Sequence, residues 1–169
     1  MTDPLSFEAQ KELLIKGWMS RDARWFMAVA RDFGPAAASR LNQGVARELG
    51  QVEMKRLMKA LSVSLPANLG EHLSLKKEAI SLFGPDLIEY EIKVLDSRSY
   101  EMHLGRCFAY ENTVRAGIKD QYECGVFARL QGWMDAEQLQ HELTPSLGKC
   151  MRVQGKECHY TIRLGFGNP

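Results

Sequence analysis

The spacing of apolar residues changes near residue 86, and this change is the strongest constraint on the fold. Before it, apolar residues recur every three or four positions, as in helices with one buried face. The segments with this spacing are 7–19, 21–32, 35–49, 52–61 and 71–82. After it, Ile88, Tyr90, Ile92 and Val94 alternate with charged residues, as in a strand with one buried face. The sequence therefore predicts a mainly helical half, residues 1–85, and a sheet-containing half, residues 86–169.

Helix ends are predicted from glycine, proline and serine. Gly17 weakens the first helix, and Ser20 can cap a second one, so we expect a break between them. Gly34-Pro35 ends one helix and begins the next. Gly50 is expected to break or kink the third helix, and Gly84-Pro85 to end the last.

The second half is predicted to contain an antiparallel sheet. The predicted strands are 88–94, 100–106, 142–144, 149–153 and 157–166, the last two forming a hairpin, with a helix over 122–139. Helices followed by strands indicate an α+β fold, in which an N-terminal helical layer packs on an antiparallel sheet. No linker interrupts residues 1–169, so we expect a single domain.

Charge and hydropathy limit the partners that this chain is expected to have. The net charge is +1 and no run of lysine or arginine occurs, which argues against nucleic-acid binding. No segment approaches the roughly 20 apolar residues of a membrane span. The first residues lack the pattern of a signal peptide, so we expect a cytoplasmic protein whose thiols are kept reduced.

Four cysteines, Cys107, Cys124, Cys150 and Cys158, are the candidate metal ligands. Their spacing is too wide for the paired knuckles of a zinc ribbon. In the predicted hairpin, a turn at 154–156 would bring Cys150 close to Cys158. Cys124 is expected near a helix start, which favours the thiolate that a metal requires. The alternative interpretation is that several of these are buried free cysteines.

The segments around these cysteines resemble the four-vinyl-reductase-like domain. They are Cys107-Phe108-Ala109-Tyr110, Tyr122 to Phe127 with Gly132-Trp133 behind it, and Cys150 to Cys158. Two further segments, Gly17 to Phe26 and Ala116 to Cys124, are similar to a family of small cytosolic bacterial and archaeal proteins. The C-terminal half is also distantly similar to aminothiazoline-carboxylate hydrolase-like proteins.

The resemblance implies the fold of the nitric-oxide-sensing haem domain and the Golgi transport-particle subunits, in which helices and a four-stranded sheet enclose an apolar cavity. Aromatic-sensing relatives hold a zinc ion with three cysteines, matched here by Cys124, Cys150 and Cys158, and with a glutamate. Leu147 occupies the position of that glutamate. We expect Cys107 to be the fourth ligand, with Glu123 and Glu142 as alternatives. A site with four cysteines is closed and therefore structural.

An apolar chamber of this kind would be lined by aromatic side chains. The candidates are Trp18, Trp25, Phe26, His103, Phe108, Tyr110 and Phe127. The polar groups expected at the mouth of the pocket are Arg21, Asp22 and Arg24, between the two tryptophans, and a solvated helix turn is the alternative explanation for them. By strand alternation His103 shares a face with Cys107, which makes it a weak candidate for a general base if the metal keeps an open position.

These observations favour a cytosolic protein that binds a small apolar or aromatic molecule in a chamber closed by structural zinc. One alternative is a metal-dependent hydrolase or lyase acting on a small ring. Another is an assembly subunit that forms a homodimer. The chain has no phosphate-binding glycine loop and no nucleophile elbow, so the sequence gives little support to an enzyme.

Overall fold

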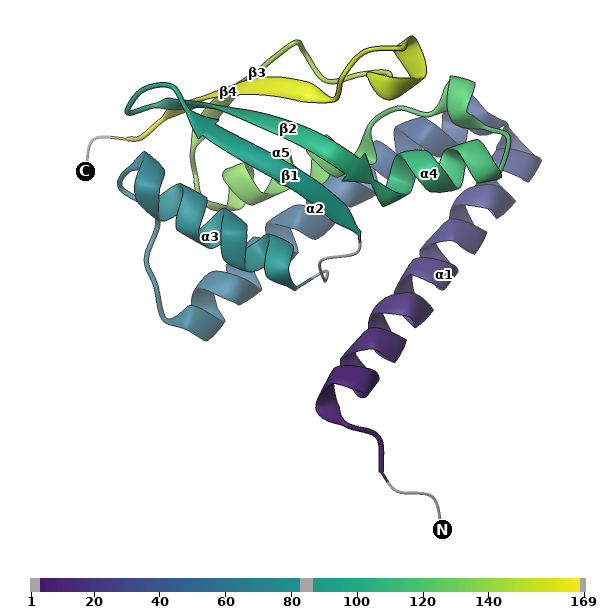
Figure 1. Cartoon of the computed structure of the whole chain (residues 1–169), viewed down its shortest axis with the longest axis horizontal. Coiled ribbons are helices and arrows are strands. Elements are labelled where there is room, and N and C mark those ends of the chain that lie inside the picture. The colour runs from purple at the N-terminus through teal and green to yellow at the C-terminus, as the bar shows by residue number, and fades with distance from the viewer. Residues whose placement is uncertain (1–3, 83–86, 168–169) are drawn as a thin grey trace.

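The computed structural model describes residues 4–82 and 87–167, and it has the predicted α+β architecture (Figure 1). The helices are α1 (Phe7–Phe33), α2 (Pro35–Leu61), α3 (Leu69–Ser81), α4 (Phe108–Arg115) and α5 (Gly125–Ala136), with short 3-10 turns η1 (Lys119–Gln121) and η2 (Arg152–Gln154). The strands are β1 (Ile88–Val94), β2 (Ser99–Cys107), β3 (Gln140–Thr144) and β4 (His159–Gly165). Among these residues, no helix combines the length and the hydropathy needed to cross a membrane. The helix end expected at Gly84-Pro85 lies outside the described residues.

Helix α1 is continuous where the sequence predicted two helices. Ser6 caps it by accepting a hydrogen bond from the backbone N–H of Ala9, and Gly34 ends it with a φ of 86°. The predicted break is wrong because Gly17 faces open space and costs the helix only about 1 kcal/mol, which neighbouring turns offset. Ser20 simply continues the helix.

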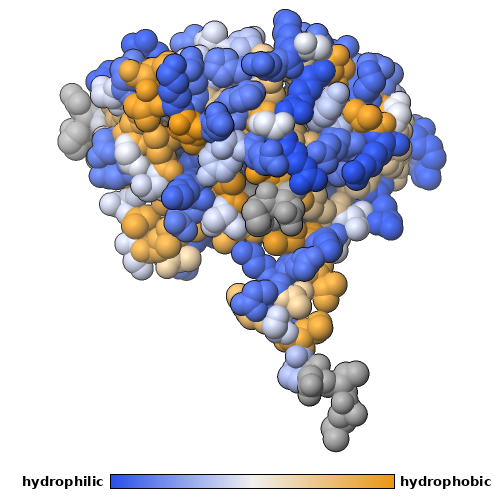
Figure 2. Space-filling model, in the orientation of Figure 1, coloured by the Kyte–Doolittle hydropathy of each residue, from blue (hydrophilic) through white to orange (hydrophobic). Residues whose placement is uncertain are grey.

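The first half of α1 projects from the body of the molecule (Figure 1), and α1 contains no buried residue. Figure 2 shows apolar side chains on this projecting segment. Phe7 is 77% exposed and Leu14 is 74% exposed. Helix α1 contacts α2. The fold therefore leaves a long apolar surface in water, which is unusual for a helix that acts alone.

Helices α2 and α5 cross closely at two glycines. The segments that meet are Arg47 to Glu53 in α2 and Arg129 to Asp135 in α5, and both have the spacing Arg-x-x-Gly-x-x-acid. A Cβ atom on Gly50 would overlap the backbone carbonyl of Arg129, and one on Gly132 would overlap that of Arg47. Arg47 pairs with Asp135 at 2.6 Å, and Arg129 pairs with Glu53. The predicted break of α2 at Gly50 is therefore wrong, and Gly50 instead permits the close crossing with α5.

The sheet has the order β1-β2-β4-β3, and all of its pairs are antiparallel. The alternation predicted for the last strand is confirmed, because Tyr160, Ile162 and Leu164 are buried. Together with Met102 and Leu104 of β2 they form the inner face, against which α2, α3 and α5 pack. One continuous core thus joins the helices to the sheet.

A β-bulge at Gly105 changes the direction of the side chains at the end of β2. Glu89 pairs with Arg106 and Tyr90 pairs with Leu104, which leaves Gly105 without a partner. Cys107 is consequently buried, like Leu104, while His103 stays on the opposite face. The predicted shared face of His103 and Cys107 is therefore wrong.

The predicted hairpin over 149–153 and 157–166 is also wrong. Its first arm is a bridge residue, Lys149, followed by the turn η2, so only β4 is a strand. Lys149 pairs with Glu123 instead, in front of α5. Cys150 therefore approaches the other cysteines through the α5 entry segment and not through a turn shared with Cys158.

Candidate functional site

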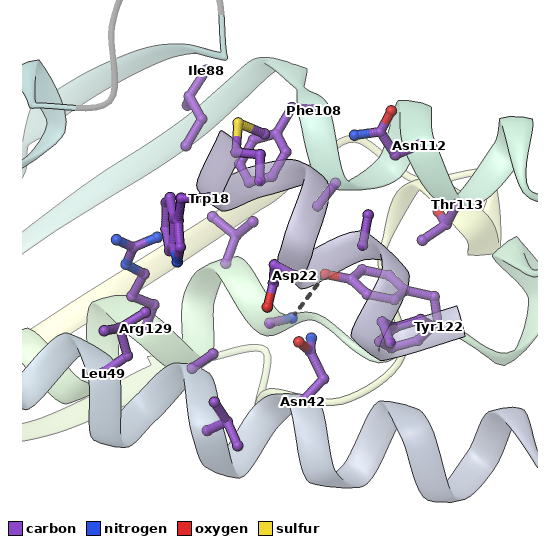
Figure 3. Close-up of a pocket in the computed structure, with 18 of the residues that line it drawn as sticks. Trp18, Asp22, Asn42, Leu49, Ile88, Phe108, Asn112, Thr113, Tyr122 and Arg129 are labelled. Atoms are coloured by element: carbon purple, nitrogen blue, oxygen red, sulfur yellow. Dashed lines mark hydrogen bonds between the residues drawn. The ribbon is translucent and has the colours of Figure 1, made fainter. Parts of the chain in front are cut away.

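A cavity of about 190 Å³ lies between α1, α2, α4, α5 and the inner face of the sheet (Figure 3). Its apolar wall includes Trp18, Phe26, Ile88, Met102, Phe108 and Trp133. Trp18 and Asp22 are exposed members of the lining, so the cavity reaches solvent beside α1. The cavity lies at this position because each of these elements turns its core-facing side chains toward it.

Most polar groups of the lining are held by other protein groups. The Arg129 guanidinium pairs with Glu53 and lies 4.9 Å from the centre of the Trp18 ring. The Tyr122 hydroxyl accepts a hydrogen bond of 3.2 Å from the backbone N–H of Gly125. The Thr113 hydroxyl donates to a backbone carbonyl at 2.8 Å. These groups form part of the wall, and each already has a partner within the protein.

Asp22 and Asn42 differ from these groups. In the part of the chain that the structure describes, neither side chain forms a hydrogen bond or an ion pair with the protein. Burial is the main cause that raises the pKa of Asp22, against the opposing effects of Arg129 and Arg21. Asp22 comes from α1 and Asn42 from α2, and both lie in the same part of the cavity, beside Tyr122 (Figure 3).

The aromatic residues expected in the chamber are distributed over three places. Trp18, Phe26 and Phe108 line the cavity. Trp25 is 66% exposed on the outer side of α1, Tyr110 lies under the Arg152 guanidinium, and Phe127 packs on Tyr160 with ring centres 4.0 Å apart. His103 is on the sheet face opposite Met102 and therefore points away from the cavity.

The four cysteines are buried and lie at meeting points of the sheet with α4 and α5. Cys107 ends β2 and precedes α4, and Cys124 precedes α5. The backbone N–H of Cys150 donates to Tyr122, and the carbonyl of Cys158 accepts from Leu104. The chain thus brings all four positions, which are distant in sequence, to one end of the sheet.

Electrostatic effects also indicate that the four thiols are neighbours. Burial is the largest cause that raises the pKa values of Cys107, Cys124 and Cys158. The Cys107 and Cys150 thiols raise the pKa values of both Cys124 and Cys158 further. Arg152, which donates to the Leu104 carbonyl at 2.7 Å, has the opposite effect on Cys107 and Cys158.

The donor atoms fit zinc by their chemistry, because zinc accepts four thiolates. Their arrangement does not yet form a site. Within residues 4–82 and 87–167, no three histidine, cysteine or acidic side chains form a group that could hold a metal ion. Leu147, which stands where the glutamate was expected, packs against the apolar core. A zinc site would require the thiols to turn toward a common centre.

A second cluster, which the sequence analysis missed, is a chain of buried polar side chains. Lys76 donates to the Tyr100 hydroxyl at 2.5 Å, and Tyr100 lies 3.1 Å from His72 Nε2. His72 Nδ1 lies 2.6 Å from Glu137 Oε2. Burial is the largest cause that lowers the pKa of His72, and a neutral ring can accept from Tyr100 and donate to Glu137.

This series of hydrogen-bonded side chains has an ionisable group at each end, Lys76 and Glu137. Burial lowers the pKa of Lys76 to about 8, although Glu137 opposes the change. Glu137 Oε1 is buried and has no hydrogen-bond partner among the described residues. A signal existed in the sequence, because His72 and Lys76 are four residues apart on the apolar side of the predicted helix over 71–82. Their partners Tyr100 and Glu137 come from distant elements.

Comparisons with protein-family profiles, with curated proteins and with solved structures found no match to this chain.

Proposed function

We propose that this protein binds a small apolar or aromatic molecule in the cavity between α1, α2, α5 and the sheet. The observation that carries the proposal is a cavity of about 190 Å³ with an apolar wall and two polar side chains, Asp22 and Asn42, that form no hydrogen bond or ion pair with the residues of 4–82 and 87–167. Binding sites for small molecules commonly combine an apolar wall with a few polar groups. An apolar cavity of about 150 Å³ can hold benzene, so the volume fits a single ring with a small substituent.

Tryptophan NMR signals provide the test, because two of the three tryptophans line the cavity. Titration with isopropylbenzene should shift the indole N–H signals of Trp18 and Trp133. Trp25 lies outside the cavity and serves as an internal control. Saturable shifts of the first two signals alone support the proposal. Absence of any shift, or equal shifts of all three signals, contradicts it.

We also propose that Cys107, Cys124, Cys150 and Cys158 bind a structural zinc ion. The support is the burial of four thiols at one end of the sheet, with the Arg152 cation beside them to offset the negative charge of four thiolates. The ion would join β2, β4 and the entry to α5, next to the cavity wall. The cysteines would then stabilise the fold and take no part in chemistry.

Metal analysis of protein purified without added metal tests this part of the proposal. We expect about one zinc ion per chain, and a large loss of zinc in Cys150→Ser. The matched control is Ser74→Ala, a small change outside the cysteine cluster. Less than about 0.3 zinc per chain, with four thiols that react without denaturant, would contradict a zinc site.

One observation supports an additional assembly role, namely the exposed apolar surface of α1. We propose that the occupant of this surface is a second copy of the chain, because two identical apolar helices are complementary to each other in a two-fold dimer. Light scattering should give about twice 19.1 kDa. Leu14→Glu should lower this mass, while Lys11→Glu, on the same exposed segment, should not. A monomer in the unchanged protein contradicts the role.

We do not propose the hydrolase or lyase alternative. It required His103 beside an open metal position, and the bulge at Gly105 separates His103 from the buried cysteine cluster. A binding protein therefore agrees better with the arrangement of the side chains.

A further inference from the structure

The cavity lining that the structure describes contains one cationic and one anionic side chain, and they differ in their ion pairing. This difference indicates the chemistry of the ligand. Arg129 is the cation of the lining, and Glu53 already neutralises it through a two-pronged ion pair. Asp22 is the carboxylate of the lining; the Arg129 and Arg21 charges act on it, but it forms no ion pair or hydrogen bond with the residues that the structure describes. When Asp22 is ionised, the cavity therefore presents a negative charge beside an apolar wall. Asp22 is exposed at the mouth of the cavity, so water solvates this charge until a donor group of a ligand replaces it.

The groups around Asp22 define what that partner must offer. An ionised carboxylate only accepts hydrogen bonds, whereas the Asn42 amide both accepts and donates. The Asn42 side chain lies close to the start of α5, because a Cβ atom on Gly125 would lie 2.5 Å from its amide nitrogen. The side chains of Asp22 and Asn42 approach the same space from α1 and α2 (Figure 3). This space suits an end group with two or more donors.

We propose that the ligand of the cavity is a small apolar or aromatic cation, with an ammonium or amidinium end bound by Asp22 and Asn42. This inference rests on the proposed binding function and specifies its ligand class. The ring of the ligand packs against the wall formed by Trp18, Phe108 and Met102. Its charged end replaces water at Asp22 with charge-assisted hydrogen bonds. An anionic end group is repelled by the same carboxylate.

Four probes of similar size and shape test the inference at pH 7.5. They are benzamidine, which is cationic, benzamide, which is neutral and polar, benzoate, which is anionic, and isopropylbenzene, which is apolar. Affinities are measured by titration of the Trp18 and Trp133 indole signals. We expect benzamidine to bind at least about 10-fold more tightly than benzamide, and benzoate to bind most weakly.

Two matched variants identify the group responsible. Asp22→Asn should remove the preference for benzamidine over benzamide, measured as the ratio of the two affinities in the variant. Asp32→Asn makes the same substitution on the same helix, at an exposed residue paired with Arg31, and should keep the preference. Binding of isopropylbenzene to Asp22→Asn also shows that the cavity of the variant is intact.

The outcomes separate this inference from the function on which it rests. If isopropylbenzene binds but benzamidine has no advantage over benzamide, the cation preference is wrong and the binding function stands. The same conclusion follows if Asp22→Asn and the unchanged protein prefer benzamidine equally. If none of the four probes shifts the Trp18 and Trp133 signals, both the inference and the proposed function are wrong.

Discussion

Replacement of Gly50 by alanine should force α2 away from α5 at the point where the two helices cross. The added methyl group would lie 3.1 Å from the carbonyl carbon and 3.3 Å from the Cα atom of Arg129, and it would overlap the carbonyl oxygen. A backbone carbonyl inside a helix cannot rotate out of the way. One helix must therefore shift by on the order of 1 Å, which also loosens the Arg129–Glu53 ion pair.

The expected magnitude follows from two opposing effects. Alanine is a better helix former than glycine by about 1 kcal/mol. Overpacking of a close contact costs about 1 to 3 kcal/mol, and a backbone contact belongs at the upper end of this range. The net destabilisation by Gly50→Ala should thus be about 2 kcal/mol. Gly132→Ala makes the equivalent change on α5 and should behave alike.

Gly44 provides the control, because it is in the same helix and no neighbouring heavy atom lies within 4 Å of an added Cβ atom. Gly44→Ala should stabilise the protein by up to about 1 kcal/mol, so the two variants should differ by about 3 kcal/mol. With a urea dependence of about 2 kcal/mol per molar, the unfolding midpoints should lie about 1.5 M apart. A separation below about 0.3 M would refute the close crossing.

Three further predictions concern the ionisable groups. Because burial lowers the pKa of Lys76 from 10.5 to about 8, the unfolded chain binds more protons between these values, and stability gains from Lys76 as the pH rises. Relative to Lys76→Met, urea unfolding should show the unchanged protein gaining up to about 1.4 kcal/mol per pH unit above pH 8; a constant difference contradicts this. Glu137→Gln should cost about 3 kcal/mol in the unchanged protein and clearly less in Lys76→Met, as measured by a double-mutant cycle; equal costs would show that the two groups are not coupled. The pKa of Asp22 is raised, so its ionisation opposes folding, and Asp22→Asn should raise the melting temperature at pH 7 but not at pH 3; a lower melting temperature at pH 7 contradicts the sign.

The fold class could be predicted because the hydrophobic spacing reports which face of each element is buried. The alternation of Tyr160, Ile162 and Leu164 was sufficient to identify β4. Helix continuity was harder to predict, because Gly17 and Gly50 are both single glycines inside segments with helical spacing. Gly17 faces open space and Gly50 faces a backbone carbonyl, and only the packing of other elements separates these cases.

The candidate site could be predicted only where one element determines the direction of a side chain. Phe26 and Trp18 follow from the periodicity of α1 and line the cavity. His103 could not be placed, because the bulge at Gly105 depends on the pairing of two strands. Asn42 was missed because its role depends on contact with Gly125, which is distant in sequence.

The repeated pattern of arginine, glycine and acid at the crossing of α2 and α5 has a consequence for assembly. Each segment is complementary to the other, so each is also complementary to itself: a second α2 could offer Glu53 to Arg47 and a carbonyl to Gly50. The crossing alone does not distinguish a helix of the same chain from one of another copy. Selection of the correct partner must come from the covalent connection through α3, β1, β2, α4 and η1, so variants in these connections are the most direct route to exchange of helices between chains.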